Sequence, residues 1–290
     1  MARAADRLPE NVDGALYVDS SCIDCDTCRE LAPDVYARSR RGLSYVAVQP
    51  EDAPRRRRAL QALVSCPVAA IGFTGPTAKA EIRAAAHTLP VEIGDGIYAC
   101  GYASPDSYGA QAYLIRRPAG NVLVDSPRAA RPLLDRLREL GGVTTMFLSH
   151  RDDVADHAVY ARDFGCRRVL HADDVDAGTR AVELHVQGGD PVSLADDLVA
   201  IPVPGHTRGS MALLYRDDTL FSGDHLWWDD DGLWAERSVC WWSWSEQRRS
   251  LRKLLDHSFR RILPGHGGRH DAGSPAVMRA ALERLVARLG

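Results

Sequence analysis

Residues 199–210 read VAIPVPGHTRGS, an apolar strand that runs through a glycine into His206. The same arrangement, an apolar run followed directly by a polar residue, recurs three more times in the second half of the chain. These repeats are TTMFLS (144–149) before His150, TLFSG (219–223) before Asp224, and RRILPG (260–265) before His266. Strand ends that open onto loops are where mixed sheets place their ligand residues. Four such ends in chain order predict one metal centre.

The segment after the first of these strands is HRDDVADH (150–157), which is dense in metal-binding side chains. Three aspartates and a second histidine follow His150 on this loop: Asp152, Asp153, Asp156 and His157. Crowded carboxylates and imidazoles stay charged at low cost only in water or around a metal. This density supports the same metal centre.

The motifs GHTRGS (205–210), SGDHL (222–226) and PGHGG (264–268) resemble those of the metallo-β-lactamase-fold superfamily, with the spacing of its glyoxalase II-like members. The resemblance covers roughly residues 90–290 and implies an αββα sandwich with metals at one edge, between the two sheets. Carried over, it assigns His150 and His206 to a first metal, Asp156, His157 and His266 to a second, and Asp224 to a bridge between them.

The first motif departs from the family pattern HxHxDH, because HRDDVADH is two residues longer and has an aspartate in place of the second histidine. No ungapped register satisfies both ends. We therefore expect a two-residue bulge that lets both ends reach the metals, with Asp152 or Asp153 as an oxygen ligand. Exchanging an imidazole for a carboxylate shifts the preference from zinc toward iron or manganese, although geometry and availability usually decide the metal.

Two functions are expected from this resemblance. The leading one is metal-dependent hydrolysis of a thioester, ester or lactone, with Asp224 or Asp156 as the catalytic carboxylate that orients the attacking water and passes on its proton. The alternative is a mono- or di-iron oxidoreductase or oxygenase. Flavodiiron-type proteins, which are similar, also carry a carboxylate at the second-histidine position, and persulfide dioxygenases hold one iron with the counterparts of His150, His206 and Asp224.

Four of the seven cysteines lie in the first quarter of the chain. Cys22, Cys25 and Cys28 stand in SCIDCDTC (21–28), and Cys66 stands before a proline in SCPVAAIG (65–72). Three thiolates on one tight loop with a remote fourth suit an iron–sulfur cubane, whereas a structural zinc site more often pairs two CxxC knuckles. Cys100, Cys166 and Cys240 share no spacing and are expected to be core thiols.

With GALYVDSSCIDC (14–25) and ELAPDVY (30–36), this region resembles bacterial-type ferredoxins with a single cluster, over roughly residues 12–75. The resemblance implies one [4Fe–4S] cluster, since the helical stretch EDAPRRRRALQALVS (51–65) stands where a second cysteine motif would lie. A zinc site and a module that has lost its cluster are the alternatives. The cluster would donate electrons to an iron enzyme, or act as a sensor or structural remnant in a hydrolase.

The chain has 290 residues, enough for two domains. We expect a ferredoxin-like domain at 1–78, a linker at 79–89 and a catalytic domain at 90–290, so that the fold class is α+β and α/β. In the second domain the pattern predicts three early strands, a helix and a C-terminal amphipathic helix. They span Val91–Tyr98, Ala112–Arg116, Asn121–Val124, Arg128–Leu140 and Ser274–Leu289.

Composition limits the partners. The chain is 45% hydrophobic and 26% charged with a net charge of −3, and its basic residues are scattered apart from Arg55 to Arg58. These values argue against nucleic-acid binding, and no apolar run has the roughly 18 residues that a membrane span needs. The first residues lack an apolar signal segment, so a cytoplasmic location is expected. The expected partners are a small-molecule substrate and a redox protein, with Arg55 to Arg58 as a solvated helix face or a docking site for such a protein.

All six tryptophans fall between residues 227 and 244. A loop or hairpin whose indoles wall the metal cleft would give an apolar or aromatic substrate pocket. Packing against the ferredoxin domain is the competing interpretation. The residues expected to bind substrate are Trp227, Trp228, Trp234 and Trp241, together with Arg208 and His225 beside the proposed ligands.

Overall fold

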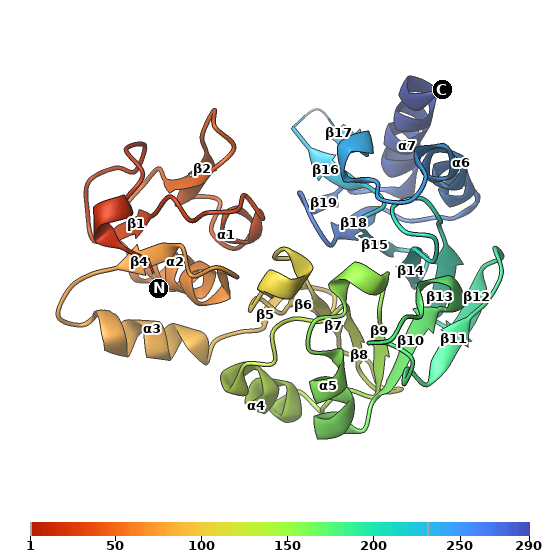
Figure 1. Cartoon of the computed structure of the whole chain (residues 1–290), viewed down its shortest axis with the longest axis horizontal. Helices are drawn as coiled ribbons and strands as arrows, with labels where there is room; N and C mark the ends of the chain where they lie inside the picture. Colours follow the sequence, from red (N-terminus) through yellow and green to blue (C-terminus); the bar gives the residue numbers. More distant parts are fainter. Residues whose placement is uncertain (1, 231) are drawn as a thin grey trace. The chain divides into compact units, whose positions relative to one another are not determined.

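The computed structural model describes residues 2–230 and 232–290, and its elements are labelled in Figure 1. The chain divides into two compact units. The first comprises Met1–Val122 and Ser126–Val143, and the second comprises Leu123–Asp125 and Thr144–Gly290. Over the described residues, no helix combines the length and the apolar character needed to cross a bilayer.

The first unit begins with a small module of short strands and helices, followed by the first strands of a larger sheet. Its elements are β1 (Leu16–Val18), α1 (Thr27–Leu31), β2 (Tyr36–Arg38), β3 (Ser44–Val46), α2 (Ala53–Ser65), β4 (Ile71–Phe73), α3 (Ala78–Ala86), β5 (Val91–Gly94), β6 (Ile97–Ala99), β7 (Tyr113–Ile115) and α4 (Arg131–Glu139). Strand β8 (Val122–Val124) lies where the two units divide.

The small module is held together by β1 pairing antiparallel with β4 and by the hairpin β2–β3. Helix α2 begins where Asp52 accepts a hydrogen bond from the backbone of Arg55, an N-cap that satisfies one of the free donors of the first turn. Leu16, Val35 and Val46 are fully buried in its core. The residues expected as a linker form most of α3, which packs against α2.

The second unit carries the remaining helices and strands. They are β9 (Thr145–Phe147), α5 (His157–Phe164), β10 (Arg167–His171), β11 (Leu184–Val186), β12 (Val192–Ala195), β13 (Leu198–Pro202), β14 (Met211–Tyr215), β15 (Thr219–Gly223), β16 (Trp227–Asp229), β17 (Gly232–Trp234), α6 (Trp244–Lys253), β18 (Arg261–Pro264), β19 (His270–Asp271) and α7 (Pro275–Leu289).

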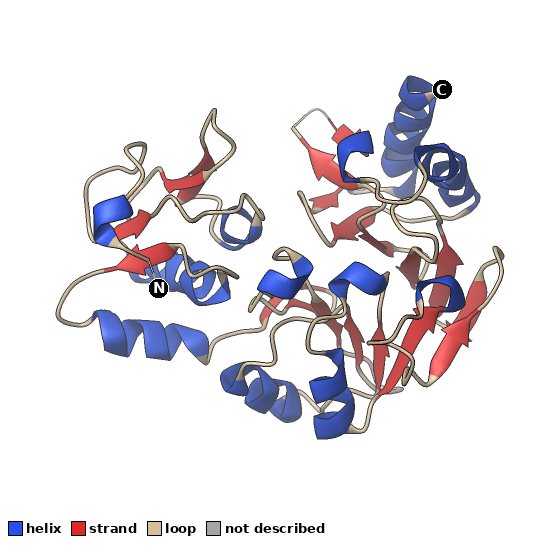
Figure 2. Cartoon of the chain, in the orientation of Figure 1, coloured by secondary structure: helices blue, strands red, loops and turns tan. Residues whose placement is uncertain are grey.

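Two larger sheets form a mixed α/β architecture. One has the strand order β11-β10-β9-β8-β7-β6-β5, and the other β12-β13-β14-β15-β18-β19. In the second unit, α6 and α7 lie side by side against the six-stranded sheet, as Figure 2 shows. Buried Leu251 of α6 and Leu282 of α7 share a hydrophobic core with Leu220 and Ile262 of that sheet. The helices α6 and α7 therefore cover and hold the sheet whose strand ends carry three of the polar residues singled out by the sequence.

The predicted elements are found with one change. The strand expected at Val91–Tyr98 is a hairpin of β5 and β6, because Asp95 and Gly96 have positive φ angles of 55° and 74°. An Asp-Gly pair in this conformation forms a tight hairpin turn. The C-terminal helix is confirmed, with Ser274 as its N-cap.

Candidate metal centre and cluster site

Four loops of the second unit bring ligand-type side chains together. His150 follows β9, His206 follows β13, Asp224 follows β15 and His266 follows β18. One oxygen, Oδ2 of Asp224, lies 3.7 Å from the Nε2 atoms of all three of these histidines. The side chains that sequence alone placed at strand ends therefore converge on a single carboxylate.

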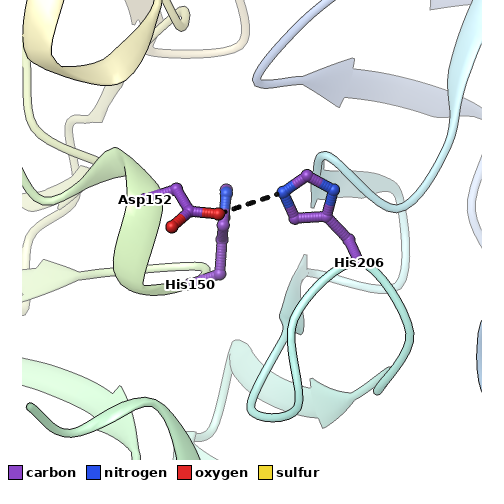
Figure 3. Close-up of side chains that lie close together, drawn as sticks. All are labelled: His150, Asp152 and His206. Carbon is purple, nitrogen blue, oxygen red and sulfur yellow. Dashed lines mark ion pairs between the residues drawn. The ribbon is translucent and has the colours of Figure 1, made fainter. Parts of the chain in front are cut away.

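Two further aspartates join this group from the short 3-10 helix Arg151–Asp153. Oδ2 of Asp152 lies 3.4 Å from Nε2 of His206, as drawn in Figure 3, and Oδ2 of Asp153 lies 4.0 Å from Nε2 of His150. Donor atoms within 4.8 Å of one another form two sets, His150 with Asp152 and His206, and His150 with Asp153 and Asp224.

Unpaired buried atoms show that these side chains fit a divalent metal. Nε2 of His150, Oδ2 of Asp153 and Oδ1 of Asp224 have no hydrogen-bond partner among the described residues. Buried polar atoms are normally paired, so orphans that converge are a metal-type arrangement. A Cβ at Gly265 would lie 2.6 Å from Oδ1 of Asp224 and 3.0 Å from Oδ2 of Asp153, so only glycine leaves room for both carboxylates.

Electrostatics agree with this fit. Burial lowers the pKa of His150 to about 4, which keeps the imidazole in its neutral, ligand form. Burial, with the charges of Asp224 and Asp125, raises the pKa of Asp153 well above its usual value. Burial also opposes the charge on Asp224, but His266, His150 and His206 outweigh it and lower the pKa of Asp224. A cation between these groups would compensate the buried negative charge.

Residues behind the ligands hold them in place. Oγ of Ser149 lies 2.9 Å from Nδ1 of His150, which leaves Nε2 facing the centre, and Oδ1 of Asp125 accepts a hydrogen bond from the Ser149 backbone at 2.7 Å. Burial raises the pKa of Asp125 to about 7. Asp125 is absent from the residues predicted for the site, although it ends the apolar run NVLV (121–124) and so shows the same signal as the ligands.

Asp174 joins two of the ligand loops and was also missed. This carboxylate is fully buried and accepts hydrogen bonds from Oγ1 of Thr207 (2.5 Å), the backbone of Gly209 (2.8 Å) and the backbone of Arg151 (3.1 Å). It thereby ties the loop that carries His206 to the loop that carries His150.

The far end of HRDDVADH stands apart from these donor sets. Nδ1 of His157 lies 3.1 Å from the guanidinium of Arg168. His157 belongs to neither set of donor atoms found among the described residues, so its ligand role stays a prediction. Asp156 is half-buried at the start of α5 and lies outside both sets of donor atoms. Among the described residues, the donor sets therefore draw on the first part of HRDDVADH, His150 to Asp153.

The tryptophans separate into two environments. The indole of Trp241 is 67% exposed and lies edge-on to His206, with ring centroids 6.2 Å apart. Trp228 stacks on His270 at 3.4 Å, Trp234 lies under the guanidinium of Arg288, and Trp227 packs against Gly267. Of the four tryptophans predicted to bind substrate, only Trp241 combines exposure with contact to a candidate ligand.

The other two predicted substrate-binding residues lie in contrasting positions. Arg208 is exposed and forms an ion pair with Asp173 at 3.4 Å. His225 is 1% exposed, with Nε2 at 3.4 Å from Oγ of Ser250, and burial lowers its pKa to about 3. A side chain so deeply buried is not placed to face a substrate.

The four cysteines of the first unit also come together. Cys22, Cys25, Cys28 and Cys66 line one small pocket, whose remaining wall is mostly apolar. The backbone of Ala70 donates a hydrogen bond to Sγ of Cys66 at 3.3 Å. Burial raises the pKa of the Cys25 thiol to about 11, while contacts with Thr27 favour its thiolate. Four converging sulfurs in a dry cavity with nearby donors fit a [4Fe–4S] cluster.

The arginine run beside this module is largely engaged by acidic neighbours. Arg55 and Arg58 both bind Oδ2 of Asp34, at 3.0 and 2.5 Å, and Arg56 lies 3.8 Å from Glu81. A solvated helix face paired within the module accounts for these residues.

Comparison with known proteins identifies both parts. Residues 18–73 match the family model described as the 4Fe-4S single cluster domain of Ferredoxin I. A crystal structure of DIM-1 metallo-beta-lactamase exposed to ceftazidime aligns with a TM-score of 0.50 and 15% identity, covering 67% of this chain and 95% of that one. A metallo-beta-lactamase family protein from Thermus thermophilus aligns with a TM-score of 0.48 and 22% identity, covering 68% and 80%.

These findings confirm the expected fold, a small ferredoxin module followed by a metallo-β-lactamase fold. At these identities the structural likeness establishes the fold and nothing finer. No curated protein matches the sequence.

Proposed function

We propose that this chain is a metal-dependent hydrolase acting on a thioester, ester or lactone. The observation that carries the proposal is the convergence of three imidazole nitrogens on Oδ2 of Asp224, each at 3.7 Å. Together with the unpaired atoms of His150 and Asp153, it supports one or two divalent ions at the edge of the fold. Asp152 and Asp224 would complete a first site with His150 and His206, and Asp153, Asp224 and His266 would form a second.

A divalent ion held there supplies a Lewis acid that polarises the substrate carbonyl and makes hydroxide available near neutral pH. The residues of the chain supply orientation and proton transfer. The Asp224 carboxylate lies at the middle of the three histidines, so we infer that it orients the attacking water and passes its proton to the leaving group. His150 and Asp153 are buried and keep bulk water from the inner side of the centre.

The substrate class follows from Trp241. Its indole is largely exposed beside His206, and the backbone N–H groups of Trp241 and Trp242 both donate to the His206 carbonyl, at 3.0 and 2.9 Å. These bonds hold the backbone of the segment beside His206, and the indole contacts the imidazole of that candidate ligand. An aromatic surface in this position favours an apolar or aromatic acyl group.

A second candidate is an iron oxidoreductase that receives electrons from the fused cluster. The specific observation in its favour is the oxygen-rich donor set, in which Asp152, Asp153 and Asp224 balance three histidines. Carboxylate-rich sites favour iron and manganese over zinc. His157, an imidazole that a zinc hydrolase of this fold would be expected to use, lies outside both donor sets of the described residues.

Anaerobic purification, metal analysis and EPR test the two candidates. About four irons per chain, as one cluster requires, with zinc in the second unit and turnover of acyl thioesters or lactones, would support hydrolysis. About two further irons and no zinc, with dioxygen or peroxide reduction, would support the oxidoreductase. Cys25→Ser separates the two mechanisms, since a hydrolase keeps its turnover without the cluster and a cluster-fed enzyme loses it. If His206→Ala left both activities intact, the metal centre itself would be assigned wrongly.

A further inference from the structure

A residue outside the matched ferredoxin module lies against a cluster cysteine. Gly109 follows the short helix Pro105–Ser107 in the loop of residues 101–110 between β6 and β7, and it belongs to the same compact unit as the cysteines. A Cβ built on Gly109 would lie 2.5 Å from Cβ and 2.9 Å from Sγ of Cys25. Its φ of 88° is a second reason for glycine here. The loop backbone therefore packs directly on the ligand.

Thr27 links the same cysteine to the same loop. Its side chain is buried, and its hydroxyl donates to the Gly109 carbonyl at 3.1 Å. Sγ of Cys25 lies 3.5 Å from that hydroxyl oxygen. The hydrogen bond from Thr27 to Gly109 joins residues 82 positions apart in the sequence. Thr27 itself lies within the CxxCxxC segment, between Cys25 and Cys28. A hydroxyl placed between a ligand sulfur and a loop carbonyl couples the positions of both.

The loop also contacts the segment that carries the fourth cysteine. The Ala103 backbone donates to the Ser65 carbonyl at 3.1 Å, directly before Cys66. Arg128, whose backbone binds the Tyr102 carbonyl, donates from its guanidinium to the Val64 carbonyl at 2.9 Å. Residues 101–110 therefore contact both segments that carry the cluster cysteines, the CxxCxxC segment and the segment that ends at Cys66.

We propose that the loop 101–110 helps to hold the cluster in its site. Gly109 and Thr27 are the positioning residues for Cys25. The bound cluster and the ordered loop stabilise each other, because coupling between two events is reciprocal. This inference concerns the first unit alone and stands whichever reaction the second unit performs.

Gly109→Ala tests the close approach. We expect the purified, cluster-loaded variant to lose its cluster to an iron chelator about tenfold faster than the unmodified chain, in line with the usual effect of removing support behind a metal ligand. Gly188→Ala is the matched control, since Gly188 has a φ of 78° and a Cβ there meets nothing within 4 Å. An alanine at position 188 has similar backbone strain, because of the positive φ, but its Cβ meets no neighbouring atom. Equal rates of loss in all three proteins would overturn the proposal.

Thr27 gives a test that does not depend on introducing a clash. Thr27→Val removes the hydroxyl at nearly constant volume, whereas Thr27→Ser keeps it. We expect faster cluster loss in the valine variant, because the Gly109 carbonyl loses its donor. We also expect a shifted midpoint potential, because the loop then packs less closely on Cys25 and potentials respond to solvent exposure at the sulfurs. The serine variant should restore both. A valine variant with the original loss rate and potential would contradict a positioning role for Thr27.

The reciprocal effect is measured on the loop. Gly109 N–H bonds to the Ser104 carbonyl at 2.8 Å and Ala110 N–H to the Ser107 carbonyl at 2.9 Å. In Cys25→Ser, which lacks a cluster ligand, we expect the amides of 101–110 to exchange with solvent faster, while those of α7 are unchanged. Unaltered exchange in the loop would show that the loop does not depend on the cluster.

Discussion

Asp174 shows how one side chain prepares the metal centre without touching it. Its carboxylate is the common acceptor for Thr207, Gly209 and Arg151, which belong to the two loops that present His206 and His150. We predict that Asp174→Ala lowers the free energy of unfolding by about 3 kcal/mol, because two buried donors and one part-buried donor lose this partner. Metal affinity should fall by about tenfold. Chemical denaturation and a metal-binding titration measure the two effects.

Asp173 supplies the control for this prediction. It is adjacent in sequence, but its carboxylate is partly exposed and pairs with exposed Arg208. Asp173→Ala should change stability by less than about 0.5 kcal/mol, as for most surface substitutions. Equal losses in the two variants would mean that the burial of Asp174 has no special effect on the ligand loops.

His157 and His206 differ in what their imidazoles contact. Nδ1 of His157 lies beside the Arg168 guanidinium, whereas His206 faces Asp152 and Asp224. We predict that His206→Gln loses bound divalent metal and that His157→Gln retains it with a lower melting temperature, since Arg168 then loses a partner. The metal content of the two purified variants tests this prediction. Loss of metal from both would support the ligand role predicted for His157.

These residues also show what sequence patterns can and cannot predict. His150, His206, Asp224 and His266 were expected to converge because each follows an apolar strand, and the structure brings them together. The direction of His157 depended on how two extra residues turn the loop, which spacing alone does not determine. The roles of Asp174 and Gly109 could not be predicted from sequence patterns, because the residues that they contact are far away in sequence.

The segment before α6 places Trp241 beside the candidate ligand His206. Its position is set by backbone hydrogen bonds to His206, so removing the indole leaves the segment in place. We predict that Trp241→Ala raises KM for an aromatic acyl substrate by about tenfold, within the range for losing one aromatic contact, with metal content unchanged. Trp242→Ala is the control, since Trp242 is also exposed and shares the same backbone acceptor. Equal KM changes in both variants would argue for a nonspecific surface effect.

Strand β11 is held beside β10 by a charged pair as well as by the backbone. Glu183 accepts hydrogen bonds from Arg168, which lowers the pKa of Glu183 from 4.5 to about 2. A depressed pKa contributes stability that is fully present above 4.5 and is lost as the pH falls toward 2. We predict that Glu183→Gln is less stable than the unmodified chain at neutral pH and that the difference shrinks through this window.

Urea midpoints at several pH values measure this effect, with Glu283→Gln as a control. Glu283 also pairs with an arginine, Arg279, but both side chains are more than half exposed. Its substitution should give a small difference with little pH dependence, because exposed pairs contribute little. A difference that grew as the pH fell would contradict the proposed role of Glu183.

At the level of elements, local patterns predicted most helices and strands of the second half. The exception at Val91–Tyr98 had a visible signal, since Asp95-Gly96 is a strong hairpin pair within an apolar run. The role of α3 was less accessible. Its small and charged residues suggested a linker, and only packing against α2 reveals it as part of the first unit.

Across the whole molecule, the two inorganic sites draw their ligands from separate compact units. Every cysteine of the cluster site lies in the first unit, and all candidate metal ligands lie in the second. We predict that His206→Ala keeps its full iron–sulfur content and that Cys25→Ser keeps its full divalent metal. In the double variant, the losses in unfolding free energy should add to within about 0.5 kcal/mol, as for substitutions that share no partners. A larger deviation, or loss of one metal group when the other is removed, would show that the sites are energetically coupled, and would favour the oxidoreductase over the hydrolase.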